Sequence, residues 1–336
     1  MADSSPDRFL ILRLGSMGDI IHTLPAVAAL RDAFPAARLD WLIERKWLPL
    51  IASNPALAAP IPLDRGLAGT LAAVRTLRRN AYTCAIDFQG LYKSALFAYL
   101  SAAPHRIGLS RAFARESGAA LFYTQAVAPS GTHVVDQFLS IAATAGARSG
   151  PARFPLVIPE SARSDIARRL QQQGVADYFI VSPGGGWRSK CWPPERYGEL
   201  CRALEESRGL RAVVNFGPGE AALADAVCRA AAPVSPLGME TDIPNLMALL
   251  SRARLVVAAD TGPLHLAVAL GTPVVALFGP TNPRRNGPYC PVDVVVQNAS
   301  LSEKTHHRGR DFATSMLSIT VEQVLAAVRT RLERAP

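Results

Sequence analysis

One carboxylate, Asp19, lies where a helix is expected to begin in the stretch LRLGSMGDIIHTLP, residues 12–25. The stretch resembles a strand end, a glycine-bearing loop and a helix start. Such a junction often binds phosphate, because the first N–H groups of a helix are unpaired and the helix dipole is positive there. A carboxylate repels phosphate, however. Asp19 therefore either stabilises the helix N-terminus or acts as a general base toward a ligand that is not a phosphate.

A second candidate site is the stretch VSPGGGWRSKCWPPERY, residues 181–197, in which three glycines follow an expected strand. Glycines let a ligand approach the backbone closely, and Arg188 and Lys190 add positive charge. The stretch is therefore either a diphosphate site with Lys190 as its point charge, or a flexible turn with solvated basic residues. It has neither the GK[ST] of a Walker A loop nor a clean GxGxxG pattern.

A third candidate is the stretch VVAADTGPLHLAVAL, residues 256–270, where Asp260, Thr261 and His265 converge on one strand end. Gly262 permits a tight turn before the next helix. Thr261 either caps this helix or helps its free N–H groups to bind a phosphate or a sugar hydroxyl. In the stretch NFGPGEAA, residues 215–222, Glu220 either stabilises a helix start or binds ribose hydroxyls.

The stretch DFQGLYKSA, residues 87–95, places two more polar side chains after a strand. Gln89 directly follows the strand, and Lys93 lies at the start of the next expected helix. Lys93 either holds an anionic acceptor or is a solvated residue of a helix start.

These residues all lie between short apolar runs and longer amphipathic patterns, an alternation that predicts βαβ units with a parallel sheet. A stretch rich in Gly, Pro, Ser and Arg, roughly residues 145–160, predicts a linker between two α/β domains. Ligands of such sheets bind at the carboxyl ends of the strands. Two facing sheets would then form a cleft. The predicted strands are 8–14, 38–43, 84–88, 178–182, 210–217, 255–260 and 273–280. The predicted helices are 19–33, 70–80, 93–102, 194–207, 220–232, 243–253, 263–270 and 320–335.

The chain has 336 residues and a net charge of +9, with 49% hydrophobic and 19% charged residues. This composition predicts a globular protein with an anionic partner. Because no run of five basic residues occurs, we expect no nucleic acid partner. Five widely spaced cysteines are typical of reduced cytosolic thiols. Neither a signal peptide nor an apolar stretch of bilayer length is found, so we expect a protein that does not cross a membrane.

The motifs LGSMGD, DFQGLYKSALFAYL, GWRSKCWPPERY and DTGPLHLAVALGTPVVALFGPT occur in the order found in glycosyltransferase family 9, and the chain resembles that family over nearly its whole length. The family comprises the ADP-heptose:lipopolysaccharide heptosyltransferases. Arg115–Glu116 and the helical pattern at residues 133–142 resemble the type I enzymes most. The resemblance implies a GT-B fold, with two Rossmann-like domains whose parallel sheets face each other across a cleft. Residues 1–157 would bind the acceptor and 158–319 the nucleotide sugar, and the last helix, 320–336, would pack back on the first domain.

The resemblance also implies roles for individual residues. Asp19 would be the base that activates an acceptor hydroxyl for inverting transfer, and the acceptor would be the Kdo of Kdo-lipid A. No cofactor would be required, and Mg²⁺ is not implied. The enzyme would be cytoplasmic and peripheral at the inner membrane. Donor-binding residues would be Gly185, Gly186, Lys190, Glu220, Thr241, Asp260, Thr261, Gly262 and His265. Acceptor-binding residues would be Ser16, Met17, Gly18, Gln89 and Lys93.

The chain departs from the family in two places. Residues 184–186 are glycines where relatives often carry Thr or Ser, so backbone N–H groups would replace hydroxyl contacts. The stretch before the last helix lacks the cysteines of many relatives, and carries a basic patch of either solvated or phosphate-directed residues: His306, His307, Arg308 and Arg310. Three other functions stay open: a transferase using another ADP- or UDP-sugar, a dinucleotide-dependent oxidoreductase, and a non-catalytic sugar-nucleotide-binding protein.

Overall fold

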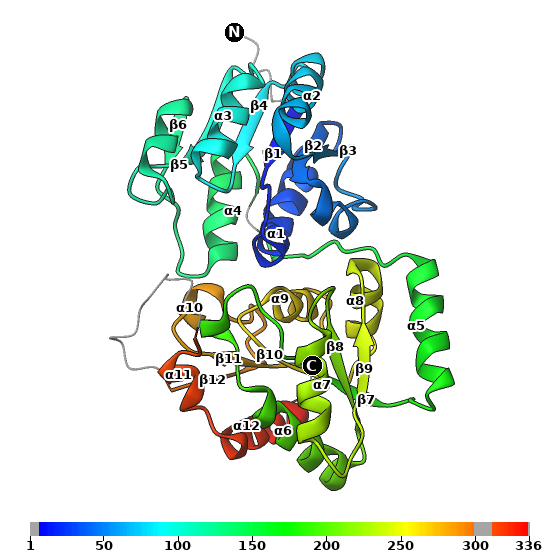
Figure 1. Cartoon of the computed structure of the whole chain (residues 1–336). Helices are drawn as coiled ribbons and strands as arrows, with labels where there is room; N and C mark the ends of the chain where they lie inside the picture. The colour runs from blue at the N-terminus through cyan, green and yellow to red at the C-terminus, as the bar shows by residue number, and fades with distance from the viewer. Residues whose placement is uncertain (1–6, 149, 299–310, 335–336) are drawn as a thin grey trace. The chain divides into compact units, whose positions relative to one another are not determined.

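The structure, a computed structural model, describes residues 7–148, 150–298 and 311–334. The chain divides into two compact units, Met1–Val157 and Ile158–Pro336, each built on one sheet (Figure 1). Every strand pairing is parallel, and helices connect most of the strands. The predicted α/β fold class with parallel sheets is thus confirmed.

In the first unit, α2 and α3 cover one face of the sheet, where their apolar residues join those of β1, β2 and β4 in one core cluster. Helices α1 and α4 pack against each other. The strands are β1 (Arg8–Leu12), β2 (Arg38–Glu44), β3 (Ala59–Leu63), β4 (Cys84–Asp87), β5 (His105–Leu109) and β6 (Gln125–Val127). The helices are α1 (Met17–Ala33), α2 (Gly66–Arg79), α3 (Tyr92–Leu100) and α4 (Val134–Thr144), with 3₁₀ turns η1 (Arg45–Leu50) and η2 (Ser117–Phe122).

The second unit repeats this plan with more helices. Its strands are β7 (Tyr178–Ser182), β8 (Arg211–Phe216), β9 (Leu237–Glu240), β10 (Leu255–Ala259), β11 (Val274–Phe278) and β12 (Val294–Gln297). Its helices are α5 (Glu160–Gln172), α6 (Pro194–Arg208), α7 (Ala221–Ala230), α8 (Ile243–Leu250), α9 (Gly262–Ala269), α10 (Pro283–Asn286), α11 (Thr314–Leu317) and α12 (Val321–Glu333), with the 3₁₀ turn η3 (Arg188–Lys190).

Both sheets have the same strand order. The first runs β3-β2-β1-β4-β5-β6 and the second, read from its other edge, β9-β8-β7-β10-β11-β12. This is the 3-2-1-4-5-6 order of doubly wound dinucleotide-binding folds. The order reverses between β1 and β4 and between β7 and β10. Ligands of open α/β sheets bind outside the carboxyl ends of the strands at such a switch point. The segments that follow these four strands carry Asp19, Gln89, the three glycines and Asp260.

The last helix corrects one expectation. Rather than packing on the first domain, α12 packs on α6, β11 and β12 of the second unit. Its residues Val324 and Val328 are fully buried in the core of that unit. Arg331 forms a buried ion pair of 2.7 Å with Asp293, just before β12, and the Trp192 indole donates to the Ile319 carbonyl ahead of α12. An amphipathic pattern shows that a helix has an apolar face, but does not say which face of the protein covers it.

Two further expectations concern the chain's surroundings. The basic patch at residues 306–310 lies outside the described residues. In the described parts of the chain, no helix combines the length and the apolar composition needed to cross a bilayer.

Candidate active site

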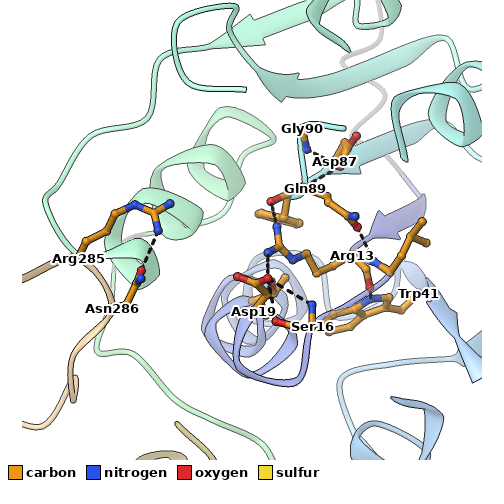
Figure 2. Close-up of polar contacts among 12 residues, drawn as sticks. Arg13, Ser16, Asp19, Trp41, Asp87, Gln89, Gly90, Arg285 and Asn286 are labelled. Carbon is orange, nitrogen blue, oxygen red and sulfur yellow. Dashed lines mark hydrogen bonds and ion pairs between the residues drawn. The ribbon is translucent and has the colours of Figure 1, made fainter. Parts of the chain in front are cut away.

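Asp19 occupies the third position of α1 and closes a capping box with Ser16. The Ser16 backbone N–H and hydroxyl both donate to its Oδ2, at 3.2 and 3.1 Å. The guanidinium of Arg13 contacts the same oxygen at 2.5 Å (Figure 2). The helix-terminus interpretation of Asp19 is thus true of its local structure. All three contacts converge on Oδ2, however, and the side chain of Asp19 is still 30% exposed, so its Oδ1 is the oxygen left for a ligand.

Arg13 is the residue of this site that sequence reasoning missed. Its side chain is only 5% exposed, although arginine is rarely buried unless it is paired. One terminal nitrogen donates to the Phe88 carbonyl at 2.6 Å, the other contacts Asp19, and the guanidinium carbon lies 5.5 Å from the centre of the Phe138 ring. The Arg13 carbonyl in turn accepts from the Trp41 indole at 3.0 Å. Arg13 therefore fixes Asp19 against β4 and α4.

The electrostatics of this pair keep Asp19 ionised. Burial opposes ionisation, but the positive charge of Arg13, the neighbouring His22 and the Ser16 N–H outweigh it and lower the pKa of Asp19 to about 2. Nearby cations and hydrogen bonds to the charged form act in this direction. Asp19 is therefore a carboxylate throughout the physiological pH range.

The other predicted acceptor residues of the first unit differ in their exposure and in their hydrogen bonds. Ser16 is exposed, Met17 is half-buried and Gly18 is buried in the first turn of α1. Gln89 joins the two strand ends of the switch point, because its Oε1 accepts the Leu14 N–H at 2.8 Å (Figure 2). The buried Asp87 fixes the turn after β4 by accepting the Gln89 N–H at 2.7 Å.

Lys93 lies on the exposed side of α3 and is held only weakly. Its ammonium is 3.4 Å from Glu44, and its side chain is 56% exposed. An exposed ion pair contributes about 0–1 kcal/mol. Lys93 can therefore leave Glu44 for an anionic ligand at little cost.

In the second unit, three predicted donor-binding residues form one chain of contacts. Lys190 contacts Asp260 Oδ2 at 2.7 Å, and His265 Nε2 lies 3.1 Å from Asp260 Oδ1. The Asp260 side chain is 4% exposed and that of Lys190 18%. Burial opposes ionisation of Asp260, but His265 and Lys190 together hold its pKa far below the ordinary value. Since both oxygens of Asp260 are engaged, this residue positions Lys190 and His265.

Lys190 is thus anchored, and the sequence did not show this. Its ammonium also lies 4.6 Å from the centre of the Trp187 ring. The pair with Asp260 fixes one direction of the ammonium, which has three donors. Thr261 is the N-cap residue of α9, yet its hydroxyl donates to the Ala259 carbonyl at 3.1 Å and makes no capping bond.

The three glycines after β7 differ in how closely other atoms surround them. A Cβ on Gly184 would lie 2.4 Å from Glu220 Oε1, so a larger residue there requires the Glu220 carboxylate to move. A Cβ on Gly185 would lie 3.0 Å from Thr261 and 3.1 Å from the Cys191 sulfur. Nothing lies within 4 Å of that position at Gly186. The Glu220 carboxylate packed against Gly184 thus favours glycine at the first of these three positions.

Glu220 and Thr241 lie at the ends of the next two strands. Glu220 folds back over its loop, where Oε2 accepts the Gly217 N–H at 2.9 Å. Thr241 is buried, and its hydroxyl accepts from the Asn215 amide at 2.7 Å. Asn215, which sequence reasoning also missed, connects Thr241 to Ser182 on β7. Its place at the end of a strand, just before a Gly-Pro-Gly loop, was the available signal.

No cluster of three or more His, Cys, Asp or Glu residues able to hold a metal ion occurs among the described residues. The structure thus brings Ser16, Gly18, Asp19 and Gln89 to one switch point, with Arg13. It brings Gly185, Lys190, Asp260, Thr261 and His265 to the other.

Known proteins match the chain across both units. A model of the family described as glycosyltransferase family 9 (heptosyltransferase) matches residues 70–314. Lipopolysaccharide heptosyltransferase 1 of Pseudomonas aeruginosa is 34% identical over 84% of this chain and 81% of its own length. Lipopolysaccharide heptosyltransferase 3 of Escherichia coli is 29% identical over 79% of this chain and 80% of its own.

A solved structure agrees with the fold. Escherichia coli heptosyltransferase WaaC with ADP-2-deoxy-2-fluoro heptose superimposes with a TM-score of 0.76, at 23% identity, over 96% of this chain and 99% of that chain. At this identity the likeness shows the fold, and it confirms the predicted GT-B class with its two Rossmann-like sheets.

Proposed function

We propose that this enzyme, which belongs to glycosyltransferase family 9, transfers a heptose from ADP-heptose to the inner core of lipopolysaccharide. The names of its relatives support the reaction, since they are lipopolysaccharide heptosyltransferases, and the WaaC structure holds an ADP-heptose analogue. Fold alone does not choose the donor or the acceptor. The residues at the two switch points carry the rest of the proposal.

The observation that carries the proposal is the environment of Asp19. A base must be ionised, fixed in direction and open on one side toward the proton that it removes. Arg13 and Ser16 hold Oδ2 by three contacts, which leaves Oδ1 for an acceptor hydroxyl. A low pKa makes Asp19 a weak base in the ground state. It removes the proton only as the hydroxyl oxygen bonds to the anomeric carbon and becomes acidic.

In the second unit, positive and N–H groups would stabilise the negative charge that develops on the leaving diphosphate. Lys190, set by Asp260, would contact the diphosphate together with backbone N–H groups of the glycine loop and of the α9 N-terminus. Glu220 would bind the nucleoside with Thr241 near it, and His265 would bind phosphate or sugar. Fixed donors aimed at a developing negative charge stabilise a transition state without a metal ion.

The acceptor is proposed to be the Kdo of Kdo-lipid A, as for a type I enzyme. Support comes from the 34% identity to a heptosyltransferase 1 and from the type I features at Arg115–Glu116 and α4. The acceptor region would comprise Ser16, Met17, Gly18, Gln89 and Lys93, with Lys93 directed at a carboxylate or phosphate of the acceptor.

The test is transfer from ADP-heptose to purified Kdo-lipid A, with mono-Kdo and di-Kdo acceptors and with a core that already carries heptose. Product on a Kdo-terminated acceptor supports the proposal, whereas product only on the heptose-bearing core would assign a later transfer step. Asp19→Asn should abolish transfer while ADP binding, measured by calorimetry, stays near normal. Equal loss of both would refute the role of Asp19, and tighter binding of UDP than of ADP would refute the donor.

A further inference from the structure

Helix α3 exposes an apolar stripe to solvent. Its inner side is formed by Ala95, Phe97 and Ala98, all buried. The residues of its outer side are spaced at three and four positions, which places them on one face of a helix. They include Tyr92, Leu96 and Tyr99, which are 52%, 43% and 54% exposed. An outward helix face is normally polar.

The 3₁₀ turn η2 extends this stripe sideways. The Tyr92 ring packs on Gly118 at the start of η2, where an added Cβ would lie within 2.6 Å of the ring. At the other end of α3, the rings of Tyr99 and Phe122 are 6.0 Å apart. Between these two contacts Leu121 projects from η2 and is 75% exposed. We call Tyr92, Leu96, Tyr99 and Leu121 the α3 patch.

Neighbouring elements add more exposed apolar side chains. Helix α2 lies beside α3 on the same face of the sheet (Figure 1). It presents Leu67 and Leu71, which are 75% and 45% exposed. Phe113, in the loop before η2, is 48% exposed. These three and the α3 patch make up seven of the ten large apolar side chains that are exposed in the described residues. A gathering of this kind marks an interaction surface rather than ordinary surface variation.

The same region carries a net positive charge. Residues 65–121 contain eight Lys and Arg against two acidic residues, a surplus of six, where the whole chain has +9. One of the two acids, Asp87, is fully buried, and the other, Glu116, accepts the Tyr92 N–H. The cations border the α3 patch: Arg106 stacks on Tyr99 at 5.7 Å, and Arg78 donates to the Leu100 carbonyl. Arg75 and Arg79 are exposed on α2.

We propose that the α3 patch docks on an anionic lipid bilayer. Aromatic and leucine side chains enter the boundary between headgroups and acyl chains, and a surrounding ring of Lys and Arg is attracted by acidic headgroups. The inference rests on the proposed function in one respect, the lipid-linked acceptor. Helix α3 begins three residues after Gln89 and carries Lys93 in its exposed stripe. Docking through α3 therefore presents the acceptor region to a headgroup at the bilayer surface.

Vesicle sedimentation tests the proposal without donor or acceptor. The full chain should bind phosphatidylcholine vesicles that contain phosphatidylglycerol, and bind them much less when phosphatidylglycerol is omitted or salt is raised. The double variant Leu96→Gln with Leu121→Gln should weaken binding by at least about tenfold, because both side chains leave water in the bound state. The control is Leu317→Gln with Val295→Gln, two exposed apolar residues of the second unit, 42% and 38%. The control should bind like the wild type.

A charge variant gives a second line of evidence if the apolar variant folds poorly. Arg75→Gln with Arg79→Gln should weaken binding to the anionic vesicles and leave the thermal melt unchanged. Wild-type protein that fails to bind the anionic vesicles would overturn the proposal. A patch variant that binds the vesicles like the wild type would also overturn it. The same holds if light scattering shows that the wild type is a dimer and the patch variant a monomer, because the patch would then be a dimer interface.

Activity then separates this proposal from the proposed function. The patch variant should lose transfer to a vesicle-embedded acceptor but keep transfer to a delipidated, water-soluble one. If the wild type binds vesicles but transfers heptose to neither acceptor, the proposed function is refuted and the α3 patch remains a lipid-binding surface.

Discussion

Replacing Arg13 by methionine removes the cation from Asp19 Oδ2 while it keeps a long side chain near the Phe138 ring. The magnitude follows from the pKa of Asp19, which is lowered from 3.8 to about 2. Each pKa unit corresponds to about 1.4 kcal/mol, so the environment favours the carboxylate by roughly 2.5 kcal/mol. Because the side chain is 30% exposed, solvent screening makes this an upper value.

The sign of the effect is fixed by the direction of this pKa shift. A depressed pKa of a carboxyl group adds stability that is present above the unfolded value of 3.8 and is lost as the pH falls through about 2. In Arg13→Met the opposing effect of burial remains, so the pKa of Asp19 should rise toward its ordinary value. The variant should lose up to about 2.5 kcal/mol near neutral pH and much less at pH 3.

Two measurements follow Asp19 directly. Carboxyl ¹³C chemical shifts, assigned by their absence in Asp19→Asn, should titrate at higher pH in Arg13→Met than in the wild type. The acidic limb of kcat/KM should move in the same direction. We also expect kcat to fall by about 10²-fold, because a catalytic group misplaced by about 1 Å loses roughly that factor.

Arg13→Lys is the matched control, since it keeps the charge and loses the forked geometry. It should give an intermediate kcat and a smaller rise in the pKa. Unchanged carboxyl titration and an unchanged acidic limb in Arg13→Met would refute the claim that Arg13 controls Asp19. A loss of stability that persists in the double variant with Asp19→Asn would assign the effect of Arg13 to packing and to the Phe88 carbonyl instead.

Three further predictions concern the second unit. Lys190→Met should weaken ADP binding in calorimetry by about tenfold or more, since it removes a charge-assisted contact to phosphate; unchanged binding would exclude that contact. Gly184→Ala should weaken ADP binding and lower the melting temperature, because the Glu220 carboxylate must move away from a Cβ that lies 2.4 Å from its Oε1, whereas Gly186→Ala has open space and should leave the melting temperature unchanged. Arg331→Met should cost about 3–5 kcal/mol in urea unfolding, because it leaves its aspartate partner buried and unpaired; a loss below 1 kcal/mol would show that α12 is held by apolar packing alone.

The central part of each sheet was predictable from the sequence, and the outer strands were not. The strand predicted at 178–182 coincides with β7, and α6 differs from its prediction by one residue. The missed strands β3, β5, β6, β9 and β12 all lie toward the edges of the two sheets. Strands buried on both faces give continuous apolar runs. Edge strands are short and partly exposed, as in APIPL of β3 and QAV of β6, and they lack this signal.

The residue types of the site could be found from the sequence, because glycines, carboxylates and cations that follow the strands of an α/β sheet lie where such sheets bind their ligands. Their pairings could not be found. Lys190 and Asp260 are 70 positions apart, and only the sheet order, with β7 beside β10, brings them within 2.7 Å. Arg13 looked like an ordinary arginine at a strand end, since a lone cation is usually solvated. The α3 patch could not be found either, because the sequence does not distinguish an exposed apolar side chain from one in the core.

The carboxylates at the two switch points have different contacts, and this difference supports different roles for them. Asp19 follows β1 and Asp260 follows β10, which are the first and the fourth strand of two sheets with the same order. Each carboxylate is paired with a cation. At Asp19, however, every contact falls on one oxygen, whereas at Asp260 one oxygen meets Lys190 and the other meets His265. A carboxylate with both oxygens engaged cannot accept a proton from a substrate without breaking a contact. The division of the oxygens, more than the pKa of either group, is therefore the reason why we propose proton removal for Asp19 and the positioning of the donor site for Asp260.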